Sequence, residues 1–164
     1  MGRDLRDLQK KLNEVAAFMQ NDASKILKTE GLKFIQQNFQ DEGFHDGSLQ
    51  KWQPRKTTDK RGRDITRYRT NRRGKQGTLN KYGRQIKDRP ILTGHNSGGN
   101  KLRHSFKARV ERQKVTFYTH KEYAQRHNEG LNGMPKRQFM GQSKTLDNNI
   151  KTKITKVLDK IFER

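Results

Sequence analysis

A long middle segment of this chain contains few residues that can form a core, and this limits what the rest can fold into. From Lys51 to Arg89 the large apolar residues number only six. Such a segment cannot bury enough apolar surface to offset the entropy that it loses on ordering. We therefore expect an extended loop or arm over about 51–90, mobile in the isolated monomer and ordered by a neighbouring subunit or partner. The six apolar residues are Trp52, Ile65, Tyr68, Leu79, Tyr82 and Ile86.

Positive charge is concentrated in the same region. Residues 51–112 carry 20 Lys and Arg against 4 Asp and Glu, and the whole chain has a net charge of +21. This charge attracts polyanions, so nucleic acid, acidic protein surfaces and anionic membranes are the candidate partners. Aromatic side chains among the cations, Tyr68 and Tyr82, could stack on unpaired bases. The cations that could contact a polyanion or an acidic partner are Arg61, Arg63, Arg67, Arg69, Arg72, Arg73, Lys75, Lys81, Arg84, Lys87 and Arg89.

Two helices are predicted ahead of the arm. Apolar residues recur at spacings of three and four over 3–20, which is the pattern of an amphipathic helix. Asn21 or Asp22 is a suitable N-cap for a second helix that ends near Gln40. Gly31 lies inside this second helix, where glycine costs about 1 kcal/mol relative to alanine. A close contact, a small bend or simple tolerance would each explain it.

The chain after the arm predicts a mixture of short elements. Alternation of apolar and polar residues over 106–110 and 115–119 indicates a β-hairpin with one buried face. The fold class is therefore α+β, in a single domain over 1–164: two N-terminal helices, a long basic arm, a small antiparallel sheet with a β-hairpin, and a C-terminal helix. The other expected elements are a short strand or extended entry at 90–92, a helical turn at 101–105, a short helix at 121–128 stopped by Gly130, and a last helix at 143–163 capped by Ser143.

Sequence patterns of enzymes and of membrane proteins do not occur in this chain. Gly94 and Gly99 have the spacing of a phosphate loop, but Asn100 stands where that loop needs its lysine. The five histidines are scattered, the acids of the middle segment do not cluster, and there is no cysteine. No apolar run approaches the roughly 20 residues that span a bilayer. We expect a soluble, non-enzymatic protein without metal, cofactor or membrane contact, made in a cytoplasm.

Two adjoining motifs are the most distinctive part of the chain. Tyr123–Gly130 reads Tyr-Ala-x-x-His-x-x-Gly, and Pro135–Gly141 reads Pro-x-Arg-x-Phe-x-Gly. Together they resemble the signature of the phage virion morphogenesis proteins, the tail-completion or head–tail joining family of tailed bacteriophages. Short matches in the expected order extend the resemblance over about 5–160. The residues that carry it are Phe34, Phe39, Gly47, Trp52, Pro54, Gly94, Tyr123, Ala124, His127, Gly130, Pro135, Arg137, Phe139 and Gly141.

The resemblance implies a minor structural component of the virion rather than an enzyme. Such proteins pack against copies of themselves, as a ring, and against neck, connector and tail proteins, with possible contact to packaged DNA. On this interpretation the motif residues hold the fold and shape a subunit surface. A basic nucleic-acid-binding architectural protein is the alternative that the charge of the arm leaves open.

Two motif residues carry more specific expectations. His127 lies near a helix end and could bond a backbone carbonyl through one ring nitrogen. Arg137 could hold the fold, pair with an acidic group on a neighbour, or be a solvated arginine.

Overall fold

The structure is a computed structural model, which describes residues 2–71, 75, 77–87, 89–93, 101–111 and 114–163. Helices and two small antiparallel hairpins make up the described chain, so the predicted α+β class is confirmed. The elements are α1 (Gly2–Asn21), α2 (Ala23–Gln40), β1 (Gly43–Asp46), β2 (Ser48–Lys51), α3 (Lys81–Ile86), the 3-10 turn η1 (Leu102–His104), β3 (Lys107–Glu111), β4 (Lys114–Tyr118), α4 (Tyr123–Glu129) and α5 (Lys144–Phe162).

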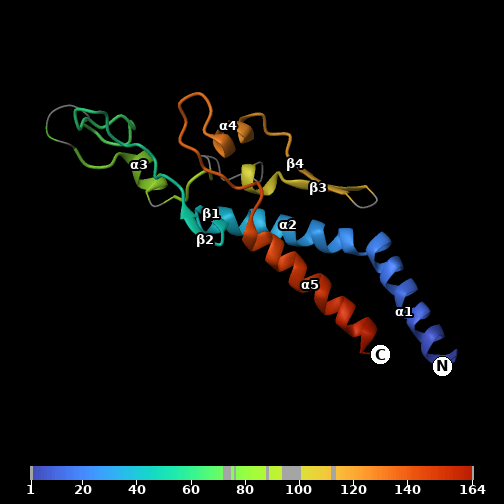
Figure 1. Cartoon of the computed structure of the whole chain (residues 1–164). Helices are drawn as coiled ribbons and strands as arrows, with labels where there is room; N and C mark the ends of the chain where they lie inside the picture. Colours follow the sequence, from blue (N-terminus) through green and yellow to red (C-terminus); the bar gives the residue numbers. More distant parts are fainter. Residues whose placement is uncertain are drawn as a thin grey trace.

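Three long helices form one end of the molecule. The chain bends between α1 and α2, and α1 and α5 extend in the same direction, so that both termini lie at the same end (Figure 1). Both predicted N-terminal helices are confirmed within a residue or two of their expected bounds. Asp22 occupies the N-cap position of α2, but its side chain makes no capping bond there and instead pairs with Lys25 at 2.6 Å. Ser143 caps α5 as predicted, since its hydroxyl accepts from the Leu146 N–H at 3.1 Å.

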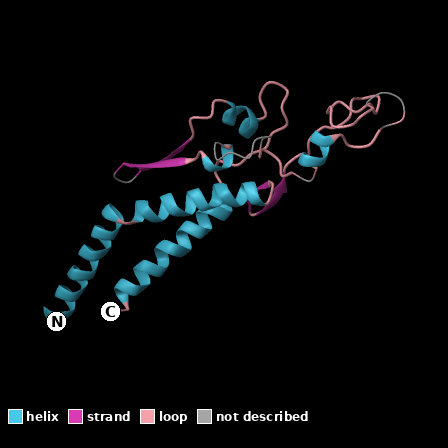
Figure 2. Ribbon diagram, turned by 180° about the vertical axis from the view of Figure 1, so that it is seen from behind, coloured by secondary structure: helices cyan, strands magenta, loops and turns pink. Residues whose placement is uncertain are grey.

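The predicted hairpin is present as β3–β4, and it lies along α2 on the side opposite α5 (Figure 2). Its inner face is only half-buried, with Val115 and Phe117 partly covered and Val110 exposed. Phe117 packs directly on α2, because a Cβ added at Gly31 would lie 2.1 Å from its ring. Of the three explanations for Gly31, the close contact is the one that the structure supports.

A second hairpin was not predicted. β1 and β2 pair antiparallel around Gly47, which has a φ of 74°, a conformation that glycine adopts without strain. The expected single sheet is therefore two separate two-stranded sheets. A short strand or extended entry at 90–92 was also predicted and is wrong, because Ile91 and Leu92 form a turn in which Leu92 has a φ of 61°.

The core is small and aromatic. Phe39 of α2 is its centre: its ring stacks on Phe139 at 5.1 Å and meets Trp52 edge-on at 5.4 Å. Leu102 and Ala124 complete the buried cluster together with Ile35. Because Trp52 belongs to this cluster, the arm leaves the body of the molecule just after it. Within the described chain, no helix is long and apolar enough to cross a membrane.

Candidate functional site at the root of the basic arm

The arm projects from the end of the body opposite the termini (Figure 1). It was expected to be a long loop or arm, and its described part also contains local structure. The arm contains α3 and two isolated β-bridges, Thr58 with Asp64 and Arg69 with Leu79. Few of its apolar residues are buried, so its order comes from hydrogen bonds.

Asp59 organises the first turn of the arm. Its carboxylate accepts from the backbone N–H groups of Arg61 and Arg63, at 2.8 and 2.9 Å, and from the Arg63 Nε at 2.7 Å. Hydrogen bonds to Arg63, backbone first, hold the pKa of Asp59 below its usual value. Short acidic side chains often bond nearby backbone N–H groups in this way.

Asp64 organises the second turn and is buried. It accepts from the backbone N–H and the hydroxyl of Thr66, at 2.8 and 2.6 Å, and it pairs with Arg69 at 3.3 Å. Arg69 also donates to the Gly77 carbonyl at 3.0 Å. Arg69, which was predicted to contact a polyanion or an acidic partner, therefore makes these contacts inside the arm.

Asn80 joins the two halves of the arm. Its side-chain oxygen caps α3 by accepting from the Gly83 N–H at 2.8 Å, and its amide donates to the Arg67 carbonyl at 2.8 Å. The α3 backbone lies so close to the first half that a Cβ added at Gly83 would be 2.3 Å from the Tyr68 carbonyl oxygen. The rings of Tyr68 and Tyr82, predicted to interleave with the cations, are 5.6 Å apart.

Three side chains make hydrogen bonds at the root of the arm, two of them to or from the body and one between the two ends of the arm. Trp52 donates from its indole to the Gln138 carbonyl at 2.7 Å. Arg137 donates to the carbonyls of Gln53 at 3.1 Å and Pro54 at 3.4 Å. Arg55 donates across the root to the carbonyls of Arg89 and Pro90, at 3.0 and 2.6 Å.

The two sequence motifs fold into one unit behind this root. Gly130 ends α4 with a φ of 75°, as predicted, and the chain returns so that the Arg137 N–H donates to the His127 carbonyl at 2.7 Å. Asn128 fixes the segment that returns past α4, because its side-chain oxygen accepts hydrogen bonds from the N–H groups of Phe139 and Met140 at 2.9 and 3.0 Å.

Arg137 is buried, with 7% of its surface exposed, so the solvated interpretation is wrong. Burial is the main reason that its pKa lies below the usual arginine value; the charge of Arg55 acts in the same direction and that of Glu42 opposes it. The side chain therefore holds the fold at the root of the arm.

His127 does not behave as predicted. Its backbone carbonyl, not its ring, makes the hydrogen bond that closes the motif turn. The ring Nδ1 is buried and has no hydrogen-bond partner in the described structure. Burial, followed by the charge of Arg137, holds the pKa of His127 below its usual value, so the neutral ring is favoured.

A cavity of about 390 Å³ lies where the motif unit meets the root of the arm. Arg55, Arg89, Arg137 and His127 supply its basic groups. The aromatic side chain of Tyr123 belongs to its lining, and its ring centre is 6.1 Å from that of His127. Among the described residues, no acidic side chain lines the cavity, and no cluster of acids, histidines or cysteines could hold a metal ion.

The predicted site residues are not all in one place. Phe39, Trp52, Ala124 and Phe139 meet in the core, with Pro54 and Arg137 at its edge. Phe34 instead packs edge-on against Phe44, at 5.5 Å. Gly47, Tyr123 and Gly141 are exposed, Pro135 is partly buried, and Gly94 lies outside the described residues.

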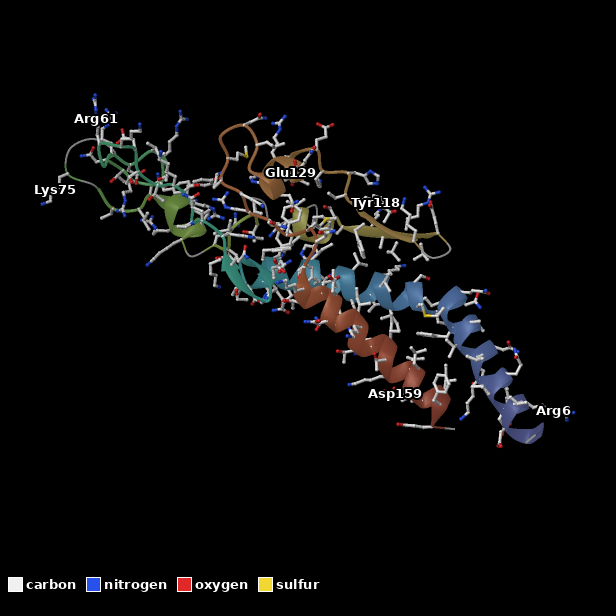
Figure 3. All side chains as sticks on the ribbon, viewed as in Figure 1. Arg6, Arg61, Lys75, Tyr118, Glu129 and Asp159 are labelled. Carbon is white, nitrogen blue, oxygen red and sulfur yellow. The ribbon has the colours of Figure 1, made fainter. Side chains whose placement is uncertain are left out.

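Most of the predicted arm cations that the structure describes are at the surface, and the labelled Arg61 and Lys75 lie at the far end of the arm (Figure 3). Arg69 and Arg89 are partly buried. Arg72 and Arg73 lie outside the described residues. The exposed set is Arg61, Arg63, Arg67, Lys75, Lys81, Arg84 and Lys87.

Two asparagines with structural roles were not predicted from the sequence. Asn38 is fully buried; it donates to the Phe139 carbonyl at 3.2 Å and accepts from the His45 N–H at 3.1 Å. Asn128 occupies an unspecified position of the first motif. Its position as the last residue of the predicted helix was the only available signal, whereas nothing in the sequence marks Asn38 as buried.

Comparison of the chain with models of protein families, with curated proteins and with solved structures finds no match.

Proposed function

We propose that this chain is a non-enzymatic structural protein of a tailed-bacteriophage virion. On this proposal it acts at the neck, where it completes the tail or joins it to the DNA-filled head, and it packs there as a homo-oligomeric ring. It is assembled in the host cytoplasm and contacts neighbouring neck, connector and tail proteins. The proposal starts from the resemblance of the two motifs and their accompanying elements to the virion morphogenesis family.

The observation that carries the proposal is the convergence of residues that carry the resemblance. Three segments of the chain supply these residues: Phe39, Trp52, and the pair Arg137 and Phe139. The first two segments are more than ten positions apart, and the last two are more than eighty apart. All four residues nevertheless lie in one core or at its edge. Their contacts support a common fold unit, and the function follows from the family that they resemble.

Self-association is supported by apolar side chains left exposed on the projecting helices. On α1, Leu5, Leu8 and Leu12 have 68%, 47% and 48% of their surface exposed, and Phe162 at the end of α5 has 47%. Contiguous exposed apolar residues commonly mark protein–protein contact sites. Packing of subunits through this end would leave the basic arms free on the other side.

Deletion of the gene in the phage tests the proposal directly. Heads should fill with DNA, whereas few joined, infectious particles should form, and supplying the wild-type gene in trans should restore them. Electron microscopy of the lysate measures both. Normal yields of joined particles without the gene would overturn the proposal.

A nucleic-acid-binding architectural protein is the second candidate, favoured by the exposed cations of the arm. Duplex binding that neutralises six or more phosphates should weaken by about 10³-fold or more between 50 and 200 mM salt. Binding that barely changes with salt would reject this candidate, whatever the phage phenotype.

A further inference from the structure

The described residues that line the cavity at the arm root have a surplus of positive charge. The guanidinium groups of Arg55 and Arg137 both line it, and both donate to backbone carbonyls of the arm root. Carbonyl oxygens satisfy N–H groups but do not neutralise charge. None of the ion pairs found among the described residues includes either arginine.

The nearby carboxylate does not remove this surplus. Glu42 attracts the charge of Arg137, but one carboxylate can offset at most one of the two guanidinium charges. The repulsive effect of Arg55 on Arg137 is larger than the attractive effect of Glu42. Like charges held together in this way are stabilised when an anion binds between them.

His127 provides an independent observation. The residue belongs to the cavity lining, and its ring Nδ1 is buried with no hydrogen-bond partner in the described structure. An unsatisfied buried polar atom is uncommon and costs about 1–3 kcal/mol, so such an atom often indicates a missing ligand. An anion in the cavity would favour the protonated form of the His127 ring, because opposite charges nearby stabilise each other.

We propose that this cavity is a binding site for a phosphate group. Arginine presents a fork of N–H donors that matches phosphate oxygens, and here two arginines and a histidine surround one space. Donors from three side chains suit a tetrahedral group with several oxygens better than a planar carboxylate with two. A space of about 390 Å³ exceeds a phosphate alone, and Tyr123 and Ile91 in its lining offer apolar surface to whatever carries the phosphate.

Two sources share this chemistry: free phosphate compounds and the backbone of a nucleic acid. The second source is the closer fit to the surroundings, because the exposed cations of the arm begin at the same root. A strand that follows the arm could place one phosphate in the cavity. This inference goes beyond the proposed virion function and does not depend on it.

Titration of the purified full chain with inorganic phosphate tests the site. We expect saturable changes in the NMR signals of the His127 ring and of the Arg55 and Arg137 Nε–H groups. Arg55→Gln should weaken binding about tenfold or more, the loss that corresponds to roughly 1.4 kcal/mol. His127→Gln should weaken it as well, while Arg126→Gln, an exposed change on the same helix as His127, should leave it unchanged.

Trp52 is the only tryptophan, so its fluorescence reports whether each variant keeps its core. Changes that do not saturate, or equal losses in Arg55→Gln and Arg126→Gln, would overturn the proposal. An acidic peptide that binds as tightly as phosphate would also overturn it, in favour of a protein partner.

Short single-stranded oligonucleotides separate the two sources. An oligonucleotide that displaces inorganic phosphate, with a dependence on Arg55, supports the site and identifies the backbone as its source. Saturable phosphate binding that oligonucleotides do not displace supports the site with a free phosphate compound as its ligand.

Discussion

The side chain of Arg137 joins the motif unit to the arm through hydrogen bonds to two carbonyls, so its loss should destabilise the root. Arg137→Gln should lower the free energy of unfolding by about 1–3 kcal/mol, because the buried side chain loses its charge-assisted hydrogen bonds to the carbonyls of residues 53 and 54. Chemical denaturation followed by Trp52 fluorescence measures this. Lys136→Gln, next to it and exposed, should stay within about 0.5 kcal/mol of the wild type. Equal effects of the two changes would contradict the assigned role.

His127 should make the stability of the fold depend on pH. Its pKa is lowered in the folded state, so above the ordinary histidine value of about 6.5 both states are neutral and the fold is unaffected. As the pH falls below about 6.5, the unfolded chain takes up a proton that the folded chain resists. The free energy of unfolding therefore decreases until the pH passes the lowered pKa.

Denaturation curves between pH 7.5 and 5.5 measure this dependence. His127→Gln should flatten it, whereas His120→Gln, an exposed control, should keep the wild-type slope. Parallel slopes for the wild type and His127→Gln would show that the buried ring titrates normally. Phosphate in the buffer should reduce the wild-type slope if the anion site exists, because a bound anion favours the protonated ring.

At the scale of elements, α2 organises the body by contacting α1, α5 and both hairpins. Its contact with β4 depends on the absence of a side chain at one position. Gly31→Ala should destabilise the fold by about 1–3 kcal/mol through overpacking against the Phe117 ring, although alanine is intrinsically the better helix former. Thr29→Ala, exposed on the same helix, should be neutral or slightly stabilising. A stabilising Gly31→Ala would show that the hairpin does not pack as described.

The arm is an element with little apolar burial and a dense set of local hydrogen bonds. Asn80 makes two of them, one to each half. Asn80→Ala should cost about 1 kcal/mol in the stability of α3, as loss of an N-cap does, and should leave the body intact. Hydrogen exchange should show faster opening within 57–87 and no change in α2. Protection lost throughout the chain would mean that arm and body unfold together.

At the scale of the whole molecule, the ends differ in chemistry: one carries exposed apolar helix surface and the other the basic arm (Figure 3). If subunits associate through the helical end, Leu8→Asp with Leu12→Asp should shift the protein from oligomer to monomer. Analytical ultracentrifugation measures the state, and circular dichroism checks the helices. Gln9→Asp, a polar change on the same helix, serves as the control. An unchanged oligomer in the double variant would place the subunit contact elsewhere.

Local signals in the sequence predicted the helices and the β3–β4 hairpin well. Apolar spacing, Ser143 as a cap and Gly130 as a stop depend on neighbours within a few positions, and the structure follows them. The β1–β2 hairpin was missed because its residues resemble the polar arm that follows. The internal order of the arm was missed because it comes from Asp59, Asp64 and Asn80 bonding backbone groups, which leaves no hydrophobic pattern.

The sequence alone determined the α+β class, the bounds of the long helices and the division into a small core and a basic segment, because these follow from local spacing and composition. Only the tertiary structure decided which contacts the motif side chains make. It turned the Arg137 side chain inward onto the arm root and left the His127 Nδ1 without a partner beside two arginines. Burial and the approach of residues more than eighty positions apart produce these effects, and no local pattern contains them.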